Sequence, residues 1–113
     1  QTSRHHWGTD IDLVSADTAF YSTPAGQKIY NWLKLNAETY GFCQPYSLSN
    51  QIIFEAYQEE KWHWSYNPLS HLFFKNYKKQ VSYNDFDSFW GSEYAQKFKV
   101  IEKYALRVDP SCF

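Results

Sequence analysis

The spacing of apolar residues predicts two helices with clear boundaries. Thr23 is suited to cap a helix that begins at Pro24, and Gly41 is suited to end it. Between them one apolar stripe is predicted, formed by Ile29, Trp32, Leu33, Ala37 and Tyr40. Asn67-Pro68 predicts the start of a second helix. Its apolar side is predicted to carry Leu69, Leu72, Phe73 and Tyr77.

The pattern after residue 80 predicts mostly helix. A loop is expected at residues 81–84, and Asp85 is suited to cap a helical segment at residues 86–90. One last long helix, ended by Pro110, is predicted from the helical spacing of Tyr94, Phe98, Ile101, Ala105 and Val108.

Short strands are predicted between and before these helices. In residues 9–13, Ile11 and Leu13 alternate with Asp10 and Asp12, so the two acids share one face. Residues 62–66 are rich in aromatic side chains and predict a second strand. We further expect a strand at 42–46, interrupted by Pro45, a loop at 47–51 and a strand at 52–57. Strands mixed with helices, without regular alternation, predict an α+β fold.

Length and charge narrow the class of protein. The 113 residues suffice for one domain, spanning residues 1–113. The net charge of −1 argues against nucleic acid as a partner, because phosphate binding needs a basic surface. No apolar run approaches the ~20 residues that a membrane span needs. No signal peptide is visible, so we expect a mature form or a fragment whose upstream segment is missing.

Cys43 and Cys112 are the two cysteines. Two cysteines far apart in sequence fit either one disulfide in an oxidising compartment or two buried thiols. The sequence leaves both possibilities open.

The first candidate site residues are His5 and Asp12. Imidazole nitrogen and carboxylate oxygen both suit zinc. Gly8 lies between them and lets the chain turn sharply, so the two side chains can converge on one point.

The second candidate pair is Glu60 and His63. In a fully extended strand these two side chains would point to opposite faces. We therefore expect a turn or bulge near Lys61. The neighbouring Glu59 is the alternative candidate for the acidic residue that acts together with His63.

The three proposed metal ligands are His5, Asp12 and His63. Structural zinc sites usually have four protein ligands, whereas catalytic sites have three and leave the fourth position to water. The ligand count therefore predicts catalytic zinc, with Glu60 as the general base that takes a proton from zinc-bound water.

Two blocks carry a resemblance to a known family. Ser3-x-His5-x-x-Gly8-x-x-x-Asp12 is followed by Glu60-x-x-His63, which is framed by Trp62 and Trp64. Together they resemble the paired signature of VanY-type zinc D-alanyl-D-alanine carboxypeptidases. The residues between the blocks, Asn36-Ala37-x-x-Tyr40-Gly41-Phe42, are also similar, so the resemblance covers about residues 3–66.

The resemblance implies a small central antiparallel sheet flanked by helices, as in the Hedgehog and DD-peptidase fold. It implies one zinc ion held by His5, Asp12 and His63, Glu60 as the base, and removal of D-alanine from peptidoglycan stem peptides. We expect a monomer. The substrate implies the cell envelope, the periplasm or the extracellular space. Trp7, Trp64 and Tyr66 are expected either to line the cleft or to pack in the core, whereas residues 67–113 are expected to be packing helices.

The chain departs from the family pattern at Asp10, where alanine is frequent. Asp10 is expected either to support a ligand from behind or to compete as one. Members also carry an upstream segment that holds the substrate carboxylate, and its counterpart here is not identified. Two other functions remain: a non-catalytic zinc-binding module that recognises cell-wall peptide or another protein, and a lysin-type endopeptidase.

Overall fold

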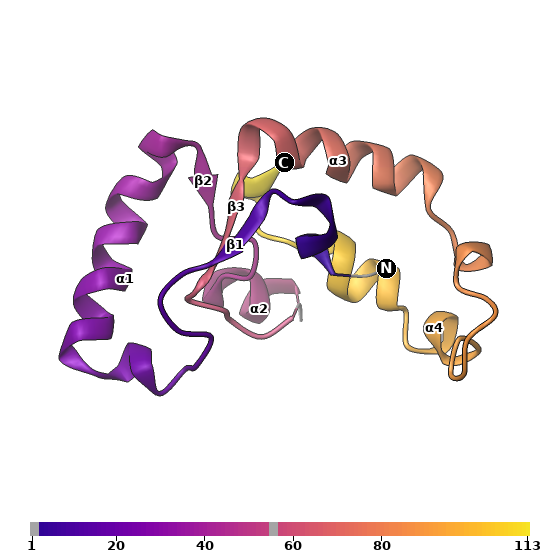
Figure 1. Cartoon of the computed structure of the whole chain (residues 1–113), viewed down its shortest axis with the longest axis horizontal. Coiled ribbons are helices and arrows are strands. Elements are labelled where there is room, and N and C mark those ends of the chain that lie inside the picture. Colours follow the sequence, from indigo (N-terminus) through magenta and orange to yellow (C-terminus); the bar gives the residue numbers. More distant parts are fainter. Residues whose placement is uncertain (1–2, 55–56) are drawn as a thin grey trace.

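A three-stranded antiparallel sheet lies in the middle of the molecule, between helix α1 at one end and α4 at the other (Figure 1). The computed structural model describes residues 3–54 and 57–113. The strands are β1 (Asp10–Asp12), β2 (Phe42–Cys43) and β3 (His63–Tyr66), in the order β1-β3-β2. The α+β class and the strands predicted at 9–13 and 62–66 are confirmed. The strand predicted at 42–46 is shorter, since Pro45 has no N–H to donate to a neighbouring strand.

Helix α1 (Pro24–Asn36) begins and ends as predicted. The Thr23 hydroxyl accepts a hydrogen bond from the Gly26 N–H at 3.1 Å. A 3-10 turn, η3 (Ala37–Tyr40), continues the helix to Gly41, whose φ of 81° suits glycine. The cap and the terminal glycine are therefore reliable signals here.

The apolar stripe of α1 is narrower than predicted. Leu33 and Ala37 are buried against Trp64 of β3. Trp32 and Tyr40 are exposed and stack on each other, with ring centroids 6.1 Å apart. The predicted stripe was wrong for these two rings, which pack on each other instead of on the sheet.

A short helix, α2 (Leu48–Phe54), lies where a loop at 47–51 and the start of a strand at 52–57 were expected. Residues 55–56 of that predicted strand lie outside the described residues. The Ser47 hydroxyl accepts a hydrogen bond from the Asn50 N–H, which favours a helical turn. Ile52 and Ile53 are exposed, so this apolar pair does not form a buried strand.

Helix α3 (Asn67–Gln80) is present as predicted, but it buries a different face. Ser70, Phe74 and Tyr77 are its buried residues. Among the four residues predicted to face the core, those left half-exposed are Leu69, Leu72 and Phe73. The prediction failed because apolar residues occur around most of this helix, so their spacing does not single out the inner face.

The C-terminal region is more broken than predicted. No helix occupies residues 86–90; a 3-10 turn, η4 (Tyr83–Asp85), precedes them, and Ser82 caps it instead of Asp85. The single long helix is replaced by α4 (Tyr94–Lys97) and a π-helical segment, η5 (Ile101–Leu106). Lys99 separates them with a φ of 52°, which a continuous helix does not allow.

The chain finally returns to the sheet. A last 3-10 turn, η6 (Pro110–Cys112), brings Cys112 to Cys43 of β2, and the two form a disulfide with a Cα–Cα distance of 5.5 Å. Of the two possibilities for the cysteines, the structure therefore has the disulfide. Within the described ranges, every helix is too short or too polar to cross a membrane.

Candidate metal centre

The pairing of β1 with β3 brings two of the predicted ligands together. Asp12 lies opposite His63, and Asp10 lies opposite Ser65. Because alternate residues of a strand share a face, these four polar side chains lie on one face of the two-stranded ribbon. The prediction that Asp10 and Asp12 share a face is confirmed, since both carboxylates lie within 4 Å of the His63 ring nitrogens.

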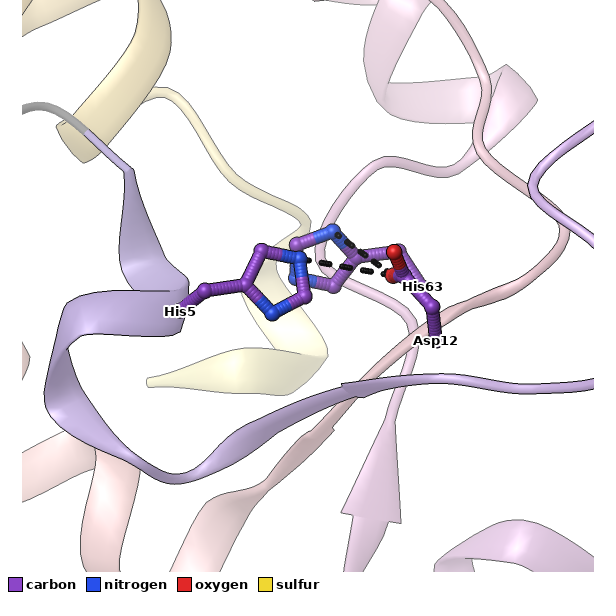
Figure 2. Close-up of side chains that lie close together, drawn as sticks. All are labelled: His5, Asp12 and His63. Carbon is purple, nitrogen blue, oxygen red and sulfur yellow. Dashed lines mark ion pairs between the residues drawn. The ribbon is translucent and has the colours of Figure 1, made fainter.

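His5 reaches the same point from a 3-10 turn, η1 (Arg4–Trp7), that precedes β1 (Figure 2). Gly8 ends this turn with a φ of 69°, a conformation that glycine adopts without strain. His5 Nε2 lies 3.4 Å from Asp12 Oδ1, and the rings of His5 and His63 are 4.5 Å apart. The turn at Gly8 thus brings the side chains of His5 and Asp12 together, although the two residues are seven positions apart in the sequence.

The three side chains have the geometry of a metal site. His5, Asp12 and His63 each offer one ligand atom, and these atoms lie within 4.8 Å of one another. His63 Nδ1 is 3.9 Å from Asp12 Oδ1. Around tetrahedral zinc, with bonds of about 2.0–2.2 Å, ligand atoms are roughly 3.3–3.6 Å apart. Small side-chain movements would therefore suffice to place all three on one ion.

The cluster is open on one side. The side chains of His5 and Asp12 are each 42% exposed, whereas that of His63 is 4% exposed. With one buried and two accessible side chains, the cluster can be reached by water and by a small molecule from its open side.

Glu60 lies directly beside the cluster. Its Oε2 atom is 2.9 Å from His63 Nδ1. The expected turn at Lys61 is present, and the His63 N–H donates to the Glu60 carbonyl at 3.4 Å. The Glu60 backbone is held in place, since its N–H donates to the Tyr46 carbonyl at 3.0 Å.

The neighbouring acid, Glu59, points elsewhere. Its carboxylate accepts a hydrogen bond from the Tyr30 hydroxyl at 2.9 Å and lies 3.7 Å from Lys61 Nζ. Of the two candidate bases, Glu60 is the one that the structure brings to the cluster.

Asp10 contacts His63 from the other side of the ring. Its Oδ2 atom lies 2.9 Å from His63 Nε2, whereas the cluster is at Nδ1. Of the two roles considered for Asp10, this position fits support of a ligand and does not fit a ligand of the same ion.

Charged partners shift two pKa values at the site. Burial alone would raise the pKa of Asp10, but the hydrogen bond from His63 and the positive charge of Arg4 outweigh it and hold this pKa below its ordinary value. Burial alone would lower the pKa of His63, but hydrogen bonds to Asp10 and Glu60 raise it. A metal ion at Nδ1 would take the place of the proton that His63 shares with Glu60.

A cavity of about 410 Å³ lies over the cluster. Its aromatic lining comes from distant segments: Tyr46, Tyr57, Trp62 and Tyr104. Apart from Trp62, which adjoins His63, no sequence pattern links these rings to the site. The sequence analysis did not find the other three.

The three aromatic residues expected at the cleft lie elsewhere. Trp64 is buried against α1, on the other face of the sheet from His63. Tyr66 packs against Phe42, with ring centroids 5.3 Å apart. Trp7 packs against Tyr77 of α3 at 5.8 Å. A direct role of these three rings in substrate binding is not supported by their positions.

A comparison with known proteins found a match, and it covers the residues of the candidate site. A family model described as VanY, D-alanyl-D-alanine carboxypeptidase, matches residues 1–69, which is more than half of the chain and includes both sequence blocks. No curated protein and no solved structure matched the chain.

Proposed function

Because the chain belongs to the VanY family of D-alanyl-D-alanine carboxypeptidases, we propose that it is a zinc-dependent peptidase that hydrolyses the bond to the terminal D-alanine of peptidoglycan stem peptides. One observation carries the proposal: His5, Asp12 and His63 converge from two separate blocks, with the Glu60 carboxylate 2.9 Å from His63. Two imidazoles and one carboxylate around an open position are a donor set suited to catalytic zinc.

Each residue has a distinct part in the proposed reaction. A zinc ion held by the three ligands would polarise the scissile carbonyl and lower the pKa of a water molecule. In that site Glu60 would act as the base that takes a proton from the attacking water, and as the acid that returns a proton to the leaving D-alanine amine. The backbone hydrogen bond from Glu60 to Tyr46 keeps the base beside His63 during both steps.

The proposed place of action is the cell envelope or the space outside the cell. The substrate class lies there, and the Cys43–Cys112 disulfide supports an oxidising compartment.

Metal content tests the centre before any substrate is needed. The zinc bound per chain is measured by elemental mass spectrometry for the wild-type protein and for His63→Ala, after loading with zinc and removal of the excess. We expect about one zinc per wild-type chain, as a three-ligand catalytic site requires, and a loss of zinc in the variant. A wild-type chain that binds no zinc after loading would refute the proposed centre.

Activity is tested on the zinc-loaded protein with synthetic stem pentapeptide and tetrapeptide. Release of a single D-alanine from either peptide is the expected product. An internal cut, visible by product mass, would identify an endopeptidase instead. Bound zinc without turnover of either peptide would favour a binding module.

A further inference from the structure

Asp10 carries a buried carboxylate behind the candidate metal cluster. Its Oδ2 atom lies 2.9 Å from both His63 Nε2 and Arg4 Nε. Its Oδ1 atom accepts hydrogen bonds from the hydroxyls of Thr9 and Ser65, at 2.9 and 2.7 Å. Four donors, from η1, from β3 and from the residue that precedes β1, therefore surround this carboxylate and fix its position.

The carboxylate of Asp10 determines which nitrogen of His63 faces a metal. An ionised carboxylate can only accept hydrogen bonds, so the proton between the two groups belongs to His63 Nε2. Glu60 Oε2 lies 2.9 Å from the other ring nitrogen, so in the metal-free protein Nδ1 shares a proton with Glu60. When a metal takes the place of that proton, the proton on Nε2 remains, and the lone pair of Nδ1, the atom that lies 3.9 Å from Asp12 Oδ1, faces the metal.

The main chain of Asp10 orients the second histidine in the same way. His5 Nδ1 lies 3.1 Å from the Asp10 carbonyl oxygen, which can only accept. His5 Nε2 is thereby left to face Asp12 at 3.4 Å. One residue thus sets the orientation of both imidazoles.

Charge neutralisation of Arg4 is the other role these contacts could have. Arg4 is 1% exposed, and its guanidinium lies over the Trp7 ring at 4.5 Å. However, Arg4 Nε binds the same oxygen of Asp10 that binds His63, so the cation fixes that oxygen at the imidazole. Arg4 Nη2 also donates to Ser65, whose hydroxyl donates to the other oxygen, so the carboxylate cannot rotate freely.

We propose that Asp10 is a positioning residue of the metal centre, whose carboxylate, held by Arg4, orients His63 so that Nδ1 faces the metal. This inference rests on the proposed zinc site. Carboxylates that hold a ligating histidine from behind typically contribute about 10–100-fold to metal affinity.

Zinc affinity provides the first test. The zinc dissociation constants of the wild-type chain, Asp10→Asn and Thr9→Val are measured by competition with a chromophoric chelator. Asp10→Asn keeps the size of the side chain and removes its charge. Thr9→Val removes a hydrogen bond to Oδ1, the oxygen away from His63. We expect affinity to fall about 10–100-fold in Asp10→Asn and to change little in Thr9→Val.

The ring tautomer of His63 provides a second readout that needs no zinc and that a packing role would not move. Two-bond ¹H–¹⁵N correlation spectra are recorded on metal-free proteins that all carry Glu60→Gln, which removes the second carboxylate from Nδ1, at a pH where the ring is neutral. In this background we expect one form, with the proton on Nε2, in Glu60→Gln alone and with Thr9→Val added, and a mixture of the two forms when Asp10→Asn is added.

The two readouts separate this inference from the proposed function. If the wild-type chain binds no zinc, the proposed function fails, while the tautomer still tests Asp10. In Glu60→Gln alone, a ring with its proton on Nδ1 would overturn the inference even if the variants with Asp10→Asn did not fold. So would a folded Asp10→Asn variant with unchanged tautomer and unchanged zinc affinity.

Discussion

His63 is the residue on which the candidate centre depends most. It lies between two carboxylates, with Asp10 at 2.9 Å from one ring nitrogen and Glu60 at 2.9 Å from the other, and the Tyr46 ring packs edge-on against it. The first contact orients the ring, and the second involves the nitrogen that faces the cluster. Because a metal and a proton compete for that nitrogen, binding of a metal would release Glu60 next to it. In the proposed mechanism, the proposed ligand His63 would thereby position the proposed base, Glu60.

The first prediction concerns Glu60→Gln. We expect this variant to keep about one zinc per chain and to release D-alanine about 10²–10⁴-fold more slowly, because the amide cannot accept a proton from water. Elemental mass spectrometry gives the zinc content, and D-alanine release from stem peptide gives the rate.

Glu59→Gln is the matched control for this prediction. It makes the same chemical change one residue away, at a carboxylate that binds Tyr30 and lies near Lys61. We expect it to retain activity. Equal rates in the wild-type protein and Glu60→Gln would assign the base elsewhere and return the choice to Glu59.

At the scale of elements, the packing of α1 on a neighbouring 3-10 turn, η2 (Phe20–Ser22), predicts whether Gly26→Ala stabilises or destabilises the protein. A Cβ at Gly26 would lie 2.2 Å from the Phe20 carbonyl oxygen. Helix propensity alone would favour Gly26→Ala by about 1 kcal/mol. We expect the opposite, a loss of about 1–3 kcal/mol in the free energy of unfolding measured in urea, because backbone atoms must move apart.

Ala25→Gly, at an exposed position of the same helical turn, is the control. It should cost about 0.5–1 kcal/mol through backbone entropy alone. A more stable Gly26→Ala variant would mean that α1 does not pack against η2 as described.

Asp109 joins α2 to the C-terminal turn η6, and its contacts predict a dependence on pH. Its carboxylate accepts hydrogen bonds from the Ser47 hydroxyl and from the N–H and hydroxyl of Ser111. Burial alone would raise the pKa of Asp109, but these hydrogen bonds outweigh it and lower this pKa. A lowered folded-state pKa means stability that is present above the unfolded value of 3.8 and lost as pH falls through the folded value.

We therefore expect Asp109→Asn to lower the free energy of unfolding by about 1–2 kcal/mol at neutral pH, because the amide is uncharged and has one accepting oxygen in place of two. The difference from the wild-type protein should narrow below a pH of about 4, where the wild-type carboxyl gains a proton. Urea unfolding at a series of pH values measures both. A difference that stays constant down to acid pH would contradict the proposed origin of the effect.

The sequence predicts some elements well because their signals are local. Thr23, Pro24 and Gly41 act on their own helix, so its ends could be predicted without knowledge of the fold. The convergence of His5 with Asp12 could be expected because Gly8 turns the chain, and the need for a turn at Lys61 follows from strand geometry alone.

Other features depend on tertiary contacts and could not be predicted. The inner face of α3 is chosen by its neighbours, since Phe74 packs beside the disulfide and Tyr77 beside Ile101, which comes from another segment. The helix is interrupted at Lys99, and no neighbouring glycine or proline in the sequence indicates this interruption. The cavity takes its tyrosines from three separate regions, so no spacing rule links them.

At the scale of the whole molecule, the C-terminal half helps to build the site. Val100 and Tyr104 line the cavity over the cluster, although they lie beyond the residues matched by the family model. The Tyr46 hydroxyl donates to the Tyr104 carbonyl at 2.8 Å, and Trp7 packs against Tyr77. The segment after residue 69 therefore supports both Tyr46, whose carbonyl binds the Glu60 N–H, and the turn that carries His5. The expectation that residues 67–113 only pack around the core is incomplete, because Val100 and Tyr104 also line the cavity.

The Cys43–Cys112 disulfide holds this C-terminal half against the sheet, and its removal gives the last prediction. It joins residues 69 positions apart, and Cys112 is fully buried. Closing a loop of that length removes chain entropy worth about 4 kcal/mol from the unfolded state.

We expect the double variant Cys43→Ser/Cys112→Ser to lose about this much unfolding free energy in urea, and reductant to have no further effect on it. The proposed metal ligands lie on η1, β1 and β3, whereas Cys43 of the disulfide is on β2, so the folded double variant should bind as much zinc as the wild-type protein. A double variant as stable as the wild-type protein would mean that the packing of Phe74 and Val108 around this position suffices to hold the C-terminal half in place.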